Sequence, residues 1–363
     1  MQVLDLNLNI EPNMPQRKDF RIGCIGSGFI MRDCHLVAYQ DAGFTPHAIA
    51  SRTYENARTV AQLRGIPKVH ETWEALVEDP DIEILDIAIP PDQQLSVVKH
   101  AVKQSHIKGI LCQKPLAMNL EEAREIVELC EAAGIKIAVN SNMRYDQAMR
   151  ALKTILDRGY LGEPVLATIE MRAIPHWQEF LHKYTHIEIL NMGIHHIDIF
   201  RYLFGDPDQI TALTRKDPRT TFEHIDGISQ YTFQYQNGLM ATSLDDVWAW
   251  PGEGAEKDIY IKWRVEGLDG MAQGTFGWPF EEKTPSTLEF TTKQFPNQWF
   301  RPKWEKVWFP DAFQGTMAQL LRAVETDSEP EIGGRDNLKS IAAVEACYRS
   351  IQEKRTVAFS EIR

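Results

Sequence analysis

The sequence predicts an α/β protein in which a doubly wound parallel sheet is followed by an α+β domain with a large, mostly antiparallel open sheet. Two observations carry this prediction. Short apolar runs alternate with amphipathic helical segments over residues 20–140, and strand-like alternation repeats over residues 209–290. A chain of 363 residues is also long enough for two domains. We therefore predict an arm, a first domain and a second domain over 1–19, 20–140 and 141–363.

The composition excludes several classes of protein. Hydrophobic residues make up 43% and charged residues 25%, which is a globular balance rather than that of a disordered chain. The net charge of -12 argues against nucleic-acid and membrane partners, because both select clustered Lys and Arg. The five cysteines form no C-x-x-C pair, and no apolar run approaches the roughly 18 residues of a membrane span. We expect a cytoplasmic protein.

The first domain is expected to contain buried parallel strands. Each apolar run is rich in Ile, Val or Leu and is bounded by turn signals, as strands covered on both faces should be. One intervening helix is well marked, since Asn119 is a suitable N-cap and Gly134 a suitable stop. The predicted strands lie at 19–26, 45–51, 83–89, 107–113 and 135–139.

The second domain has a different pattern. A helix over 144–159 is followed by a strand over 164–173 and a helix over 187–205. The strand-rich region that follows contains Asn237-Gly238, a strong hairpin signal. Two helices are predicted near the C-terminus, at 311–327 and 335–354, and the last should pack back toward the first domain.

A glycine-rich turn follows the first predicted strand. Gly26-x-Gly28 lies between that strand and a helix, where glycines allow a pyrophosphate to approach the backbone at the helix N-terminus. The third position of the full G-x-G-x-x-G pattern is Met31, so the fingerprint is incomplete, and a turn without a ligand is the alternative. We predict dinucleotide binding, with contacts from Gly26, Ser27, Gly28, Phe29 and Ile30.

The second strand ends in Ser51-Arg52. An acid at this point would grip the ribose hydroxyls of NAD, whereas a hydroxyl followed by a guanidinium can accept the 2′-phosphate of NADP. The alternative is that Arg52 only stacks on adenine or points into water. The sequence leaves NAD and NADP both open.

Lys114 follows another buried strand, between Gln113 and Pro115. Doubly wound folds bind their ligands at this end of the strands. A cation placed there can stabilise the alkoxide-like oxygen that forms as a hydride leaves carbon. The alternative is an ordinary solvated lysine.

The helix over 187–205 carries a stripe of polar residues, which includes Asn191, His195 and Asp198. A neutral histidine is a natural acceptor for a hydroxyl proton near pH 7. The stripe can instead be the wet side of the helix. Metal binding is a further alternative that we do not favour, because no HExxH-type pattern is present among the histidines at 176, 182, 186, 195 and 196.

Taken together, GCIGSGFI, AIPPD, LCQKPLAMNLEEA, NMRYDQA and GIHHIDIFRYLFG resemble the glucose–fructose oxidoreductase / inositol dehydrogenase / rhizopine-catabolism (Gfo/Idh/MocA) family. The resemblance runs from about Phe20 to the C-terminal helix. It implies a Rossmann domain, a sheet that pairs subunits into a homodimer or homotetramer, and NAD(P)-linked oxidation or reduction of sugars, cyclitols or their acids. The IHHID pattern is compatible with a pentose dehydrogenase, for instance of the D-apiose type.

The resemblance also implies roles for residues. Lys114 and His195 match the catalytic lysine and histidine, and Asn191 stands where related enzymes complete the catalytic group with Asp. Gln113 replaces the usual Glu before that lysine, and Gln94 stands where His is common. Further cofactor contacts are implied at Ile89, Pro90, Gln113 and Lys114, and substrate contacts at Arg144, His176, His195 and His196.

Two other functions remain open from the sequence. One is a non-catalytic NAD(P)-binding regulator, which the loss of the Asp at position 191 weakly favours. The other is an NAD-assisted glycoside hydrolase, in which the sugar is oxidised only transiently. Retention of both Lys114 and His195 favours the oxidoreductase over the regulator.

Overall fold

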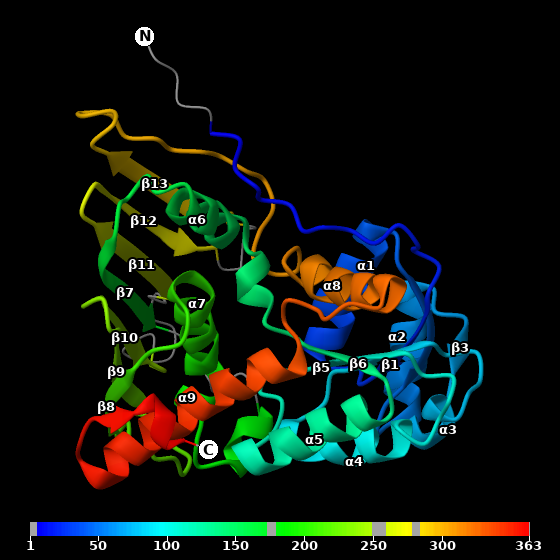
Figure 1. Cartoon of the computed structure of the whole chain (residues 1–363). Helices are drawn as coiled ribbons and strands as arrows, with labels where there is room; N and C mark the ends of the chain where they lie inside the picture. Colours follow the sequence, from blue (N-terminus) through cyan, green and yellow to red (C-terminus); the bar gives the residue numbers. More distant parts are fainter. Residues whose placement is uncertain (1–5, 173–178, 249–258, 278–283, 363) are drawn as a thin grey trace. The chain divides into compact units, whose positions relative to one another are not determined.

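The computed structural model describes residues 6–172, 179–248, 259–277 and 284–362, and the chain divides into two compact units (Figure 1). The first unit contains Pro12–Tyr145 and Phe309–Ile341. The second contains Met1–Glu11, Asp146–Trp308 and Ala342–Arg363. The domain ranges that we predict from the sequence stay predictions. In the structure, residues 309–341 group with the parallel sheet.

Within the described residues, the first unit is built on six parallel strands in the order β3-β2-β1-β4-β5-β6. This order confirms the predicted doubly wound sheet, because the chain crosses over β1 to begin its second half at β4. The very short β3 has no periodicity by which a sequence pattern could reveal it. The strands are β1 (Arg21–Ile25), β2 (Thr45–Ala50), β3 (Lys68–Val69), β4 (Ile84–Ile87), β5 (Gly109–Cys112) and β6 (Lys136–Val139).

Helices cover both faces of this sheet. Figure 1 shows α1 and α8 together on one face, and α4 and α5 together on the other. Helix α5 begins and ends where the sequence predicts: the Asn119 side chain accepts a hydrogen bond from the Glu122 N–H at 2.9 Å, and Gly134 has φ +68°. The helices are α1 (Leu36–Ala42), α2 (Tyr54–Arg64), α3 (Trp73–Val77), α4 (Pro91–Ala101), α5 (Leu120–Ala132) and α8 (Phe313–Thr326).

Within the described residues, the second unit contains eight strands in the order β13-β12-β11-β7-β10-β9-β8-β14. Among the strands in the described part of the chain, only β7 and β10 pair in parallel, so the mostly antiparallel sheet is confirmed. The predicted hairpin joins β9 to β10, and Gly238 has φ +89° in its turn. The strands are β7 (Pro164–Arg172), β8 (Gln209–Arg215), β9 (Ile228–Gln234), β10 (Met240–Asp246), β11 (Tyr260–Gly267), β12 (Gly270–Phe276), β13 (Thr287–Thr292) and β14 (Val357–Ala358).

The two faces of this sheet differ. One face is covered by α6 (Gln147–Asp157), α7 (Ile194–Phe204) and the last turns of α9 (Gly334–Glu353) (Figure 1). On this face, side chains such as Tyr231 and Phe233 are fully buried. Alternate residues point to the other face, where Leu213 is 67% exposed and Met240 45%. An exposed apolar sheet face favours pairing with a second copy, and that assembly stays a prediction.

Residues 16 and 17, predicted as part of an arm, are anchored on the first unit. Their backbone N–H groups donate to the Glu325 carboxylate on α8 at 3.0 and 2.7 Å, and Arg17 pairs with Glu83 at 2.7 Å. Among the described residues, no helix has the length and apolar character that crossing a bilayer requires.

Candidate active site

The predicted cofactor residues of the first unit meet at one edge of the parallel sheet. Four neighbouring strands, β2, β1, β4 and β5, end at this edge because they run in the same direction. Each of the predicted groups begins within two residues of the end of one of these strands. In strand order, they are Ser51-Arg52, residues 26–30, Ile89-Pro90 and Gln113-Lys114.

The fold constrains the two glycines of the turn, Gly26 and Gly28, differently. Gly26 has φ +116°, and a Cβ there would lie 2.4 Å from the backbone oxygen of Ala88, so the fold itself requires this glycine. Gly28 is exposed, and a Cβ there would meet no heavy atom within 4 Å. The fold therefore does not need Gly28, which leaves open space beside the turn for a ligand. The helix that follows opens with a π-helical turn over Ile30–His35.

Ser51 and Arg52 lie at the end of β2. The Ser51 hydroxyl donates to the Thr53 backbone oxygen at 2.7 Å, which fixes the turn into α2. The Arg52 side chain is exposed. It is therefore in a position to meet either an adenine ring or a 2′-phosphate.

Lys114 is only partly exposed, and burial lowers the pKa of its ammonium to about 7. Desolvation disfavours the charged form of a lysine, while water that reaches the exposed part of the side chain limits this effect. A lysine with such a pKa can exist in both protonation states near neutrality. It is therefore suited to respond to charge that develops on a nearby ligand.

A buried polar network that we did not predict lies next to this loop. His35 and Asp86 have no exposed surface, and His35 Nδ1 lies 2.7 Å from Asp86 Oδ2. The Tyr39 hydroxyl donates to the same carboxylate oxygen at 2.7 Å. The sequence signal is an aspartate inside the apolar strand β4, because a carboxylate is rarely buried without partners.

In the second unit, His195 lies in the first turn of α7, after a π-helical turn over Ile189–Gly193. Asn191 is 5% exposed and His195 4%, so the polar stripe is not the wet side of the helix. The His195 ring packs edge-on against Trp308, with centroids 5.7 Å apart. Trp308 is itself fully buried and holds the imidazole from one side. This aromatic contact joins positions too far apart in the sequence to be predicted.

The structure places the other predicted substrate residues in different surroundings. His196 has no exposed surface, and its Nδ1 lies 3.1 Å from Ser243 Oγ and 3.0 Å from Asp245 Oδ1. Arg144 is 4% exposed and donates to Asp336 at 2.6 Å. His176 lies outside the described residues. Substrate contacts for these residues stay predictions. Among the residues described, no group of three or more His, Cys, Asp or Glu side chains is arranged to hold a metal ion.

A cluster of buried acids lies beneath α7. Glu188 and Asp245 have no exposed surface, and Glu188 accepts a hydrogen bond from the Ser229 hydroxyl. Tyr231 donates to Asp245 at 3.0 Å and to the Gly193 backbone oxygen at 3.1 Å. Burial, reinforced by the charges of Asp245 and Asp226, raises the pKa of Glu188 well above its usual range. Glu188 therefore keeps its proton to higher pH than an ordinary glutamate, and it lies directly below the turn that precedes His195.

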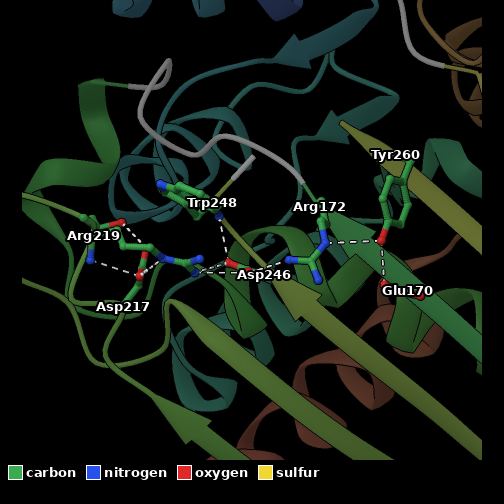
Figure 2. Close-up of polar contacts among 8 residues, drawn as sticks. Glu170, Arg172, Asp217, Arg219, Asp246, Trp248 and Tyr260 are labelled. Carbon is green, nitrogen blue, oxygen red and sulfur yellow. Dashed lines mark hydrogen bonds and ion pairs between the residues drawn. The ribbon is translucent and has the colours of Figure 1, made fainter. Parts of the chain in front are cut away.

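A second charged cluster lies on the opposite face of the same sheet (Figure 2). Asp245 and Asp246 are consecutive in β10, so their side chains point to opposite faces. Asp246 accepts hydrogen bonds from Arg172 at 2.7 Å and from Arg219 at 2.9 Å, and the Arg219 guanidinium lies 4.2 Å from the Trp248 ring centroid. These contacts tie the ends of β7 and β10 to the segment that carries Arg219.

Two family models match the chain: an oxidoreductase family with an NAD-binding Rossmann fold over residues 20–141, and the C-terminal alpha/beta domain of an oxidoreductase family over 153–359. A D-apiose dehydrogenase of Paraburkholderia graminis is 28% identical, over 100% of this chain and 96% of its own length. A D-apiose dehydrogenase of Rhizobium rhizogenes is 29% identical, over 95% and 98%. Among solved structures, an Agrobacterium radiobacter oxidoreductase in complex with NAD+, L-tartaric acid and magnesium has a TM-score of 0.81 and 25% identity, over 95% of this chain and 100% of that one.

The buried acid cluster generates a prediction about stability. Because the pKa of Glu188 in the folded chain lies above its ordinary value of 4.5, stability is complete below that pH and falls as pH rises toward the folded pKa. Glu188→Gln cannot ionise and escapes this loss. Its stability relative to the parent chain should therefore increase as the pH rises above 4.5, by up to about 1.4 kcal/mol for each pH unit until the folded pKa is reached.

Thermal melting over that pH range measures the effect. Glu163→Gln is the matched control, since it removes the same charge from an exposed side chain and should leave the pH dependence unchanged. If the difference in melting temperature between Glu188→Gln and the parent chain stays the same at every pH, the pKa of Glu188 is not raised in the folded chain and the prediction is wrong.

Proposed function

Because the chain belongs to the Gfo/Idh/MocA oxidoreductase family, we propose that it transfers a hydride between a nicotinamide dinucleotide and a sugar, cyclitol or sugar acid. The observation that carries the proposal is the shared edge of β2, β1, β4 and β5, where every predicted cofactor residue follows a strand end. The names of the relatives support a sugar substrate, and D-apiose is the first candidate.

The residues at this edge fit a dinucleotide. The open space at Gly28 lies at the β1 turn, where the backbone can approach a pyrophosphate, and Arg52 lies exposed at the end of β2, beside the ribose position of this fold. When bound, the nicotinamide ring supplies hydride acceptance or donation. The family model that covers this region is described as NAD-binding, and the choice between NAD and NADP is left open.

In the proposed mechanism, His195 removes the hydroxyl proton of the substrate. The contact with Trp308 restricts the imidazole, so little rotamer freedom is lost when the substrate binds. The ammonium of Lys114 stabilises the oxygen that becomes negative as hydride leaves the same carbon. We assign Asn191 a supporting role, because an amide can orient a hydroxyl but cannot hold charge.

The alternatives make different predictions about cofactor turnover. A dehydrogenase produces one reduced nicotinamide for each sugar oxidised. An NAD-assisted glycoside hydrolase releases product without net reduction, and a regulator binds cofactor without turnover. Absorbance of reduced nicotinamide, measured beside sugar consumption over a panel that begins with D-apiose, separates the three functions.

The mechanism predicts the kinetics of three variants at two residues. His195→Ala should slow hydride transfer by about 10²–10⁴-fold, with cofactor affinity nearly unchanged, because only the proton acceptor is lost. Lys114→Ala should lower kcat to a comparable degree, and Lys114→Arg should not restore it, since a planar guanidinium cannot replace a compact ammonium. Lys108→Ala is the control, because Lys108 is exposed and lies just before the start of β5, away from the strand end that carries Lys114. Wild-type turnover by His195→Ala would assign the proton transfer to another group.

A second prediction concerns the glycine turn. Gly28→Val should fold normally without cofactor, since the added atoms enter open space, yet it should lose the thermal stabilisation that NAD gives. That stabilisation amounts to about 2.7 kcal/mol at 100 times the Kd. Gly26→Ala provides the contrast, because its clash with Ala88 should lower the melting temperature even without cofactor. If Gly28→Val keeps the full stabilisation by NAD, the cofactor does not approach this turn.

A third prediction concerns the choice of cofactor. If Arg52 meets a 2′-phosphate, Arg52→Ala should weaken NADP binding by roughly 1.5–3 kcal/mol and leave NAD binding nearly unchanged, because a charge-assisted hydrogen bond is lost only with NADP. Arg58→Ala, which removes an exposed arginine from α2, is the control. Titration of both cofactors provides the measurement. Equal losses for NAD and NADP would show that Arg52 stacks on the adenine that the two share.

A further inference from the structure

The loop that carries Lys114 is held by a side chain from a different helix. Gln94, on α4, has no exposed surface, and its Nε2 donates toward the backbone oxygens of Gln113 at 2.9 Å, Pro115 at 3.0 Å and Leu116 at 3.1 Å. Its Oε1 accepts from the Gln113 N–H at 2.8 Å. One primary amide thus holds the backbone on both sides of Lys114.

Lys114 itself is held from the other side. Its backbone N–H donates to Gln113 Oε1 at 2.8 Å, and that oxygen also accepts from Asn140 Nδ2 at 3.2 Å. Asn140 Nδ2 lies 2.9 Å from His35 Nε2, and His35 is bound to Asp86. The backbone of Lys114 is therefore connected to a buried carboxylate through a continuous chain of hydrogen bonds.

We propose that Gln94 is a positioning residue for Lys114, which it places for catalysis by fixing the backbone of residues 113–116. The proposal rests on the proposed function, because it needs Lys114 to act in hydride transfer. A side chain without exposed surface does not contact substrate or cofactor directly, so in this proposal Gln94 acts on turnover through the backbone that it holds.

The two side chains that hold the Lys114 loop, Gln94 and Gln113, are both neutral, and this distinguishes the chain from the pattern it resembles. Gln94 and Gln113 both stand where charged or chargeable residues, His and Glu, are usual in that pattern, and both hold the same loop. A primary amide offers both an N–H donor and an oxygen acceptor, and it adds no charge to the loop. A carboxylate at position 113 would favour the charged form of Lys114 and so raise its pKa. The amide of Gln113 carries no charge and does not oppose the lowering of that pKa by burial.

The first measurement uses Gln94→Met, which keeps the size of the side chain and removes its hydrogen bonds. We expect kcat with the substrate found in the sugar panel to fall about 10- to 100-fold, because a displacement of about 1 Å at a catalytic group costs about that much. KM for the substrate and thermal stabilisation by NAD should change less than about twofold. Gln93→Met is the matched control, since Gln93 is exposed on the same helix and should retain wild-type kcat.

A double-mutant cycle distinguishes positioning from general destabilisation. If Gln94 acts through Lys114, Gln94→Met should cost little further activity in a Lys114→Ala chain, whereas an independent structural defect would lower both chains by the same factor. Gln94→His retains one donor and one acceptor and should recover part of kcat. This variant also keeps the test valid if Gln94→Met folds poorly.

Each outcome decides between the two proposals. Loss of kcat in Gln94→Met that disappears in the Lys114→Ala background, with partial recovery by Gln94→His, supports the positioning role. Unchanged kcat in Gln94→Met, or equal losses in both backgrounds, overturns it while leaving the role of Lys114 intact. Wild-type turnover by Lys114→Ala instead overturns the proposed role of Lys114, and the inference about Gln94 fails with it.

Discussion

The parallel pairing of β1 with β2 and β4 is the constraint on which the rest of the first unit depends. Parallel strands place their carboxyl ends at one edge, so segments that follow different strands are brought together there without further contacts. The close approach of Gly26 to Ala88 belongs to the same constraint, because the turn after β1 must pass beside the end of β4. A side chain at position 26 would separate these two turns.

Both units bury polar groups next to a proposed catalytic residue. Asp86 and His35 lie behind the Lys114 loop, and Glu188 and Asp245 lie below the turn that leads to His195. Burying such groups costs free energy unless every partner is in place, and a polar network that is satisfied fixes one arrangement of the chain. Among the described residues, Asp86 Oδ1 and Glu188 Oε1 have no hydrogen-bond partner, so both networks are satisfied only in part and their burial costs stability.

Neutral amides stand at three positions near the proposed catalytic residues. Gln94 and Gln113 hold the Lys114 loop, and Asn191 occupies the turn before His195. Each amide can hold a partner in place, but none can take up or release a proton. Within the proposed mechanism, His195 is therefore the group that accepts the proton, and Lys114 is the group that supplies the positive charge.

Local sequence patterns were enough to predict most strands of the parallel sheet and the strand ends that the proposed cofactor residues follow. Apolar runs with turn signals revealed β1, β2, β4, β5 and β6, because strands buried on both faces leave a local pattern. The glycine turn, Lys114 and His195 were also evident, since each lies at a fixed place relative to a predicted element. All of these features depend on residues close together in the chain.

The side chains that support the proposed site could be identified from the three-dimensional structure but not from the sequence. Trp308 meets His195 across more than a hundred residues, and Gln94 reaches the Lys114 loop from another helix. The short strand β3 and the burial of His196 were equally invisible to periodicity. The physical reason is that hydrogen-bond partners and packing contacts are set by distance in space, and a single sequence records only order along the chain.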